Sequence, residues 1–279
     1  MASAVLRERL RRDRSFQLGV ALVGLVVGAA VLAPWLAPFD PLAGDLRNAY
    51  LLGPGGHFLL GTDSQGRDVL SRVLFGARLS LGVGLVSQAV SVSLGVVLGL
   101  TAGYYGRWVD VVLMRLADVT LAFPTLLLLI AVAAAVKPSL SVVFVVIGLV
   151  GWAGMARLVR GQVLVLKHAD FVVAAQALGA VDRRVLLRHL LPNVATQVVI
   201  AATLGIAGAI MAEAALSFVG LGAQPPTPSW GAMVADGRDL LRVAPWVSLA
   251  PGMAIGVAVL GFNLVGDALR ETHDPRLGA

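Results

Sequence analysis

The sequence contains no cysteine and only four histidines among its 279 residues. The absence of thiols excludes disulfide bonds and thiolate metal sites, and four scattered histidines argue against a histidine-based metal site. The two lysines, Lys137 and Lys167, follow Val136 and Leu166, so the chain lacks the Gly-Lys-Ser/Thr sequence of a phosphate-binding loop. We therefore expect no metal, no cofactor, no ATPase within this chain and no enzyme activity.

Charged residues are also scarce. They make up 14% of the chain, where soluble domains carry roughly 25%, whereas hydrophobic residues make up 58% and the mean hydropathy is +0.85. A membrane-spanning helix needs about 20 apolar residues, and six such segments can be drawn. They run over about residues 17–37, 80–103, 113–136, 140–159, 194–220 and 246–267. The composition thus predicts an all-α, polytopic membrane protein with six transmembrane helices.

The distribution of basic residues predicts the orientation, because cytoplasmic loops of membrane proteins carry an excess of Lys and Arg. The tail before Phe16 holds five arginines against two acidic residues, and the segment from Arg157 to Arg188 holds six basic residues against two acidic ones. Segments 38–79 and 221–245 are balanced in charge. We expect both termini to be cytoplasmic and the balanced segments to lie outside. The net charge of +6 is then explained by basic residues that set the membrane topology. We therefore expect the lipid bilayer, not nucleic acid, as the partner.

The predicted organisation has five parts. A cytoplasmic tail, the first transmembrane helix and an extracytoplasmic loop occupy residues 1–16, 17–37 and 38–79. A five-helix core with a cytoplasmic loop at 161–192 and a second cytoplasmic tail follow at 80–267 and 268–279. The first apolar segment has no small-residue cleavage pattern, so we expect it to be retained, with a cleaved signal peptide as the alternative.

Small residues recur every four positions along the second apolar segment. They are Ser87, Ser91, Gly95, Gly99 and Gly103. Small residues at this spacing let the backbones of membrane helices approach closely. We expect this face to pack against another helix, and a glycine-lined pore wall is the alternative.

Two residues within the apolar segments are candidates for gating or for the translocation path. Pro124 removes a backbone hydrogen bond inside the third segment and should kink it. Glu213 lies deep in the fifth segment with no basic residue within four positions, and acids in spans are costly and often functional. Glu213 can hydrogen-bond across helices or face a water-filled path, and a proton relay is a further alternative. We expect Asp118, in contrast, to pair with Arg115.

The cytoplasmic loop reads as helix, break, helix in the stretch "DFVVAAQALGAVDRRVLLRHLLPN". Asp170 and Asp182 can act as N-caps of the two helices, and Gly179 can end the first in a left-handed conformation. Pro192 suits the first turn of the fifth span, and two arginines, Arg183 and Arg184, follow Asp182. Such a hairpin predicts a docking surface for a cytoplasmic partner, and an amphipathic helix on anionic lipid is the alternative.

The polar stretch "GTDSQGRDVLSR" precedes the second apolar segment. Its glycines provide turns, a residue near its start can cap a short helix, and Asp68 can pair with Arg72 at i, i+4. We expect an ordered element, either a turn that stabilises the second span or a contact for the substrate. Its residues of interest are Gly61, Thr62, Asp63, Gly66, Arg67 and Asp68, with Thr62 and Asp63 as the capping candidates.

At the cytoplasmic loop the sequence resembles the inner-membrane permease subunits of binding-protein-dependent ABC importers. Their loop carries Glu-Ala-Ala, three residues, Gly, nine residues and Ile-x-Leu-Pro. The matching positions hold Ala174, Ala175, Gly179, Leu191 and Pro192, with Val173 in place of the glutamate and His189 in place of the isoleucine. The stretches "RHLLPN", "LGTDSQGRDVLSRVLFGARLSL", "EAALSFVGLGAQPPTPSWGAMV" and "NLVGDALRETHDPRL" are similar to the C-type permeases of the dipeptide, oligopeptide and nickel branch.

This resemblance implies the type I ABC importer permease fold and a function in the bacterial inner membrane. The chain would form half of a path for di- or oligopeptides and would couple to ATPases through the loop that carries Ala174, Ala175 and Gly179. The implied partners are a second permease subunit, two ATPase subunits and an extracytoplasmic solute-binding protein. The alternatives are a permease for nickel or another small solute, an ion-coupled transporter that uses Glu213 and Asp118, and a scaffold without transport activity.

Overall fold

The computed structural model describes residues 13–136 and 139–273, and this part of the chain is almost entirely helical without any β-strand. Most of the predicted tail 1–16 and the end of the tail 268–279 lie outside the described residues. The long helices are α2 (Arg14–Leu36), α3 (Val69–Tyr105), α4 (Arg107–Ala122), α6 (Leu140–Leu166), α9 (Leu191–Phe218) and α11 (Trp246–His273). The short ones are α5 (Thr125–Ala134), α7 (Asp170–Ala177), α8 (Asp182–Arg184), the π-helix η1 (Val185–Leu190), α10 (Trp230–Gly237) and the 3₁₀ helix η2 (Arg238–Leu240).

The described residues contain five helices long and apolar enough to cross a membrane, or six if the bent pair α4 and α5 counts as one span. Helix α3 begins at Val69, so the end of the predicted outer loop 38–79 is helical. It can begin there because the carboxylate of Asp68 accepts a hydrogen bond from the backbone N–H of Ser71 at 2.7 Å, as an N-cap does. At 37 residues, α3 is much longer than the roughly 20 residues that a bilayer requires.

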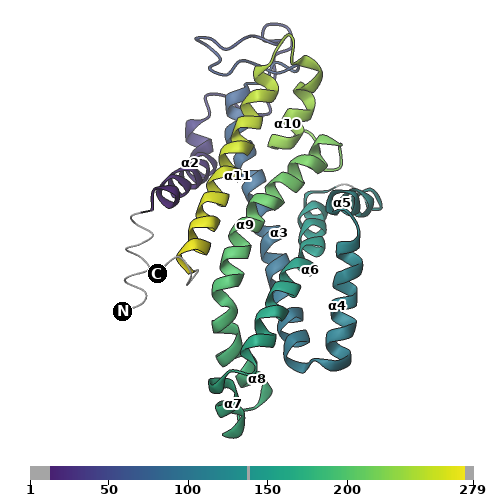
Figure 1. The fold of residues 1–279 in the computed structure, drawn as a ribbon. Helices are drawn as coiled ribbons and strands as arrows, with labels where there is room; N and C mark the ends of the chain where they lie inside the picture. Colours follow the sequence, from purple (N-terminus) through teal and green to yellow (C-terminus); the bar gives the residue numbers. More distant parts are fainter. Residues whose placement is uncertain (1–12, 137–138, 274–279) are drawn as a thin grey trace.

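The third apolar segment is two helices instead of one. Helices α4 and α5 meet at an angle of 92°, and α5 lies across the direction of α4 (Figure 1). Phe123 has an extended backbone, with φ −92° and ψ 142°, as a residue before proline often does. Pro124 cannot donate a helical hydrogen bond. The kink expected at Pro124 is therefore present as a sharp break between two helices.

The fifth span is longer and less regular than expected. Helix α8, the π-helix η1 and α9 form one apolar helical stretch from Asp182 to Phe218. Pro192 is the second residue of α9, and it has no N–H to bond the carbonyl of Arg188. The π-helical turn lies directly before it, where the regular hydrogen-bond ladder is interrupted.

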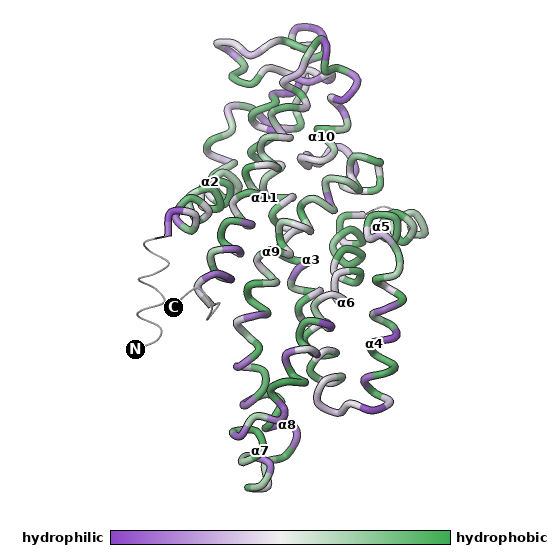
Figure 2. The backbone as a smooth tube through the Cα atoms, viewed as in Figure 1, coloured by the Kyte–Doolittle hydropathy of each residue, from purple (hydrophilic) through white to green (hydrophobic). Residues whose placement is uncertain are grey.

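The long helices pack around α3, which contacts α2, α6, α9 and α11. One apolar cluster joins Val26 of α2, Leu81 of α3, Ile210 of α9 and Phe262 of α11 around Trp230. The hairpin of α7 and α8 lies at one end of the bundle, and residues 37–68 with α10 lie at the other (Figure 1). Figure 2 shows hydrophobic residues along the long helices and many of the hydrophilic ones near these two ends. This distribution of apolar and polar residues fits a helical bundle that crosses a membrane.

Candidate functional site: an intramembrane cavity between two polar ends

The small-residue face of α3 packs against α6 of the same chain. A Cβ atom built on Gly95 would lie 2.5 Å from the Cβ of Met155, and one built on Gly99 would lie 2.6 Å from the carbonyl oxygen of Ala156. Gly103 is equally close to Val163. No larger side chain fits at these positions unless the helices separate. The face therefore makes a helix contact, as small residues at this spacing often do.

Two serines of the same face contact α6 with polar atoms. The hydroxyl of Ser87 donates a hydrogen bond to the carbonyl oxygen of Phe144 at 3.0 Å. Ser91 lies opposite Gly151, where an added Cβ would be 2.8 Å from the serine oxygen. The serines thus extend the close contact toward the middle of α3, where the helices begin to enclose a cavity.

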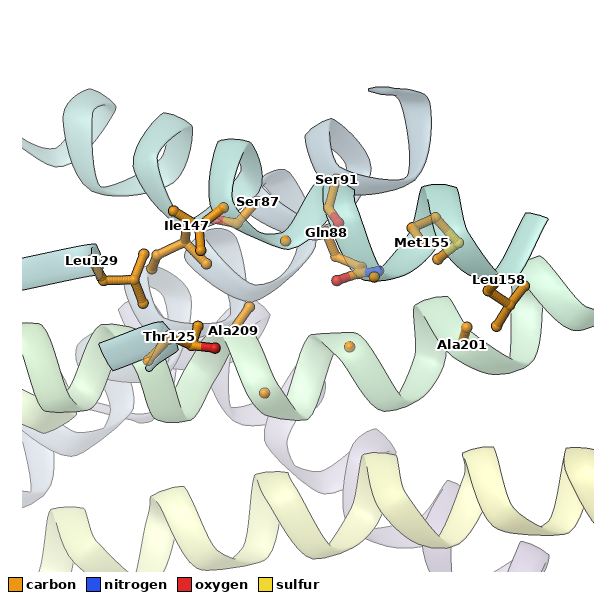
Figure 3. A pocket seen from close by; sticks show the side chains of 16 residues that line it. Ser87, Gln88, Ser91, Thr125, Leu129, Ile147, Met155, Leu158, Ala201 and Ala209 are labelled. Atoms are coloured by element: carbon orange, nitrogen blue, oxygen red, sulfur yellow. The ribbon is translucent and has the colours of Figure 1, made fainter. Parts of the chain in front are cut away.

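A cavity of about 400 Å³ lies between α3, α5, α6 and α9 (Figure 3). Its polar lining residues are Ser87, Gln88, Ser91 and Thr125, and the others are apolar residues or glycine. None of the described residues that line it is charged. Gln88 and Thr125 were not singled out from the sequence, although an amide within an apolar span was a signal that could have revealed Gln88.

The cavity is open along one side of the described chain. Gly151 and Gly154 of α6, Gly208 of α9 and Thr125 of α5 line it and are exposed. A Cβ added to Gly154 or Gly208 would meet nothing within 4 Å. This side of the cavity is therefore lined by backbone and small side chains that the chain itself leaves uncovered.

Glu213 does not line this cavity. Its side chain is buried, with 1% relative exposure, and its two oxygens accept hydrogen bonds from Ser217 at 2.6 Å and from Ser80 at 3.4 Å. Ser229, before α10, in turn donates to the hydroxyl of Ser217 at 3.3 Å. Glu213 thus joins α3, α9 and the start of α10 through hydrogen bonds across helices.

The hairpin at one end of the bundle folds around Gly179. Gly179 has φ +81°, and the N–H groups of Gly179 and Ala180 bond to the carbonyls of Gln176 and Ala175 at 2.9 and 3.0 Å. These are the two hydrogen bonds of a Schellman motif, which ends a helix with a left-handed residue. The left-handed conformation expected at Gly179 is present.

The expected aspartate caps of the hairpin are absent. The N-cap residues of α7 and α8 are Ala169 and Val181, and neither caps with its side chain. Asp170 is the first residue of α7, where its charge favours the helix dipole. The carboxylate of Asp182 instead accepts a hydrogen bond from the hydroxyl of Tyr104 in α3 at 2.8 Å. This bond ties the hairpin to the end of α3.

The hairpin has one buried and one exposed apolar face. Val172 and Val185 are fully buried against a cluster that includes Leu100 of α3 and Val163 of α6. On the other face, Leu178 is 89% exposed. The remaining exposed residues of the hairpin include Phe171, Val173, Ala174, Gly179, Val181, Asp182, Arg183 and Arg184, while Ala175 is half-buried. The hairpin is therefore packed against the bundle through one face, and it presents apolar side chains away from the bundle through the other.

Ion pairs join α4 to α6 near this end. Arg160 binds Asp110 with two hydrogen bonds, of 3.0 and 2.6 Å, a geometry that suits guanidinium and carboxylate. Arg157 pairs with Asp118 at 2.6 Å. The expected pairing of Asp118 with Arg115 is therefore wrong, because α6 brings a better-placed arginine to the carboxylate.

At the opposite end, the stretch around Asp63 is an ordered, buried polar cluster. The carboxylate of Asp63 accepts hydrogen bonds from the N–H of Gln65 and the side chain of Arg67, and lies 3.5 Å from Nε of Arg72. Thr62, Asp63, Arg67, Asp68 and Arg72 are all at most 6% exposed. The expected pairing of Arg72 with Asp68 is wrong because Arg72 reaches Asp63.

Local backbone geometry explains the rest of this stretch. Gly61 and Gly66 have φ +74° and +72°, so they form the expected turns. Thr62 and Asp63 do not cap a helix, since Asp68 is the N-cap of α3. Thr62 instead accepts a hydrogen bond from the N–H of Leu52 at 2.8 Å and donates one to the carbonyl of Ala49.

This cluster also reaches α10 and α11. The indole of Trp246 donates a hydrogen bond to the carbonyl of Thr62 at 3.0 Å. Burial raises the pKa of Asp236, and the charges of Arg72 and Arg67 act in the opposite direction. The cluster therefore anchors residues 49–68 to the ends of α3, α10 and α11, as a stabilising element would.

Known proteins resemble this chain in sequence and in fold. Residues 95–279 match the family described as the inner membrane component of binding-protein-dependent transport systems, and residues 4–54 match the N-terminal transmembrane domain of oligopeptide transport permease C. A solved structure of the MetNI methionine ABC transporter has a TM-score of 0.58 at 18% identity, covering 73% of this chain and 97% of that chain. The fold is thus that of an ABC transporter permease.

Several relatives match nearly the whole chain. A Brucella abortus protein provisionally named as a peptide transport system permease is 45% identical over 96% of this chain and 90% of its own length. The dipeptide permease DppC of Alkalihalophilus pseudofirmus is 40% identical over 97% and 88%, and the glutathione permease GsiD of Pectobacterium atrosepticum is 41% identical over 97% and 90%. The chain therefore belongs to the family of inner membrane components of binding-protein-dependent transport systems, as a multi-pass permease subunit of an ABC importer.

Proposed function

We propose that this chain forms half of an ATP-driven import path for di- or oligopeptides across a bacterial inner membrane. The substrate class rests on the relatives named as dipeptide and glutathione permeases, which are about as long as this chain and match it almost throughout. The observation that carries the coupling mechanism is the hairpin, which is fixed by one buried face and leaves its other apolar face exposed.

In this proposal, residues 169–188 dock into a cleft on an ATPase subunit. Exposed apolar side chains such as Leu178, Val181 and Phe171 are costly to leave in water and gain free energy when a partner covers them. Closure of the ATPases would push on the hairpin. Because Val172 and Val185 pack on α3 and α6, the hairpin would pass this movement to the helices that enclose the cavity.

The remaining partners follow from the same arrangement. A second, different permease subunit would cover the open side of the cavity, where a Cβ added to Gly154 or Gly208 would meet no atom of the described chain within 4 Å. A solute-binding protein would deliver peptide to the end that carries the Asp63 cluster. The hairpin and both termini would be cytoplasmic, as the basic residues favour. Two ATPase subunits would bind, one to each permease.

An ion-coupled mechanism finds less support in the geometry. Its main candidate, Glu213, is satisfied by two serine hydroxyls and does not line the cavity. Asp118, its second candidate, pairs with Arg157. The carboxylates that suggested ion coupling are therefore explained by contacts within the described chain.

Reconstitution tests the proposal. The chain is placed in proteoliposomes with the second permease, the ATPases and the binding protein that co-purify with it, and uptake of labelled di- and tripeptides is measured with and without ATP. We expect uptake that requires ATP and the binding protein. Uptake driven by a proton or sodium gradient alone would contradict the ATP-driven mechanism, and ATP-dependent uptake of nickel but not peptide would contradict the substrate class.

A further inference from the structure

The side chain of Gln88 is a polar group of the cavity that the packing of the described helices does not explain. Gln88 lies in the middle of α3, is half-buried, and extends into the space between α6 and α9 (Figure 3). Its carboxamide makes no hydrogen bond with any other described residue. A carboxamide has two N–H donors and a carbonyl acceptor, and leaving these groups unpaired within a membrane is unfavourable.

The opposite helix is shaped around this carboxamide. Gly205 of α9 lies against it, and a Cβ added to Gly205 would overlap the amide group of Gln88. The same side of the cavity is lined by Ala201, Gly208 and Ala209. Because glycine leaves room there, the carboxamide can lie across α9 and still have cavity space beside it.

The other polar groups of the cavity are less available. The hydroxyl of Ser87 donates its hydrogen bond to the carbonyl of Phe144, and the side chain of Ser91 lies close to Gly151. Thr125 lies at the exposed side. Gln88 is therefore the polar side chain best placed to form hydrogen bonds with a molecule inside the cavity.

We infer that Gln88 binds a peptide bond of the passing substrate, through its carbonyl to the substrate N–H and through its amide to the substrate carbonyl. This inference rests on the proposed peptide function. The described residues that line the cavity include no charged one, so this part of the chain offers the substrate neutral polar groups and no charged side chain. A neutral amide suits the group that all peptides share, whatever their side chains, because a carboxamide and a peptide bond each carry an N–H donor and a carbonyl acceptor.

The test compares an amide with an ester in reconstituted transport. Wild type, Gln88→Leu and Gln88→Asn are assembled with their partners, and uptake of a tripeptide is compared with that of its analogue in which an ester replaces the central peptide bond. Both probes are first matched for binding to the solute-binding protein. Ser93→Leu, an exposed position on α3 that does not line the cavity, is the control.

We expect wild type to take up the tripeptide about tenfold better than the ester, and Gln88→Leu to lose most of this preference through poorer tripeptide uptake. Gln88→Asn should recover part of it, and Ser93→Leu should behave as wild type. The inference is overturned if Gln88→Leu keeps the full amide preference and rate, or, where the leucine variant does not assemble, if Gln88→Met, which has a similar size and no carboxamide, keeps them. It is also overturned if wild type takes up both probes equally. If wild type imports no peptide at all, the proposed function fails as well, so the two failures are distinguishable.

Discussion

At the scale of single residues, backbone conformation and hydrogen bonding decide what each position tolerates. Gly179 needs its left-handed conformation but has free space around it, since an added Cβ would meet nothing within 4 Å. Glu213, in contrast, has no free space around it because its side chain is buried, and serine hydroxyls satisfy its carboxylate oxygens. Substitutions at these two residues therefore test different physical effects.

Gly179→Ala and Gly179→Val separate backbone strain from contact with the ATPase. Either substitution should cost roughly 1–2 kcal/mol in local stability because of the left-handed backbone. Gly179→Asn should be tolerated best, since asparagine adopts this conformation more readily. If the hairpin docks at this point, valine should reduce co-purification with the ATPases and peptide uptake well beyond alanine, at equal membrane levels. Equal behaviour of alanine and valine would remove Gly179 from the docking contact.

Glu213→Gln should leave peptide uptake close to the wild-type rate, because the carbonyl of glutamine can still accept the hydrogen bond from Ser217 and its amide can donate one to the hydroxyl of Ser80. Glu213→Ala should destabilise the protein by about 1–3 kcal/mol, since it leaves buried hydroxyls without an acceptor. Thermal unfolding in detergent and uptake in proteoliposomes measure the two effects. Loss of uptake in Glu213→Gln with normal stability would instead favour a proton relay.

At the scale of elements, two interruptions and one close contact shape the helices that enclose the cavity. The break at Pro124 turns α5 across α4, so that Thr125 and Leu129 reach the cavity. The π-helix before Pro192 joins the hairpin to α9 in one stretch. The glycines of α3 let the backbones of α3 and α6 approach closely. This contact is the most directly testable of the three features.

Gly99→Leu should force α3 and α6 apart, because even a Cβ would lie 2.6 Å from the carbonyl of Ala156. Overpacking of this kind costs roughly 1–3 kcal/mol, so we expect a lower yield of folded protein and a lower unfolding temperature. The matched control is Gly82→Leu on the same helix, where an added Cβ meets nothing within 4 Å. Equal yield and stability of both variants would contradict the described contact.

At the scale of the whole molecule, the hairpin and the Asp63 cluster lie at opposite ends of the bundle (Figure 1). The exposed apolar side chains of the hairpin and the open side of the cavity are both left without cover by the described chain. A single subunit of this shape is therefore expected to work within a larger complex, and its orientation in the membrane determines which partner meets which end.

The chain has no cysteine of its own, which allows the orientation to be measured with single introduced thiols. We expect Asp45→Cys and Gln224→Cys to react with a membrane-impermeant maleimide in intact spheroplasts, because both positions are exposed and lie in segments predicted outside. Asp182→Cys should react only after the membrane is permeabilised. Labelling of Asp182→Cys from outside would reverse the topology and rule out docking of the hairpin to a cytoplasmic ATPase.

The sequence by itself determined the apolar segments, the small-residue face of α3 and the left-handed turn at Gly179. These features depend on composition, spacing and local backbone preference, which can be read along one stretch of chain. The predicted segments near α2, α6 and α11 consequently agree with the helices to within a few residues at most ends.

Only the tertiary structure decided which groups meet. Arg72 pairs with Asp63 instead of Asp68, and Asp118 pairs with Arg157 from another helix. The small-residue face could have met any helix, and it meets α6. Gln88 stands out in the sequence as an amide within an apolar span, but the structure was needed to place its carboxamide against Gly205 of α9. Partners far apart in the sequence are chosen by helix packing, because a side chain bonds whichever group the fold brings within reach.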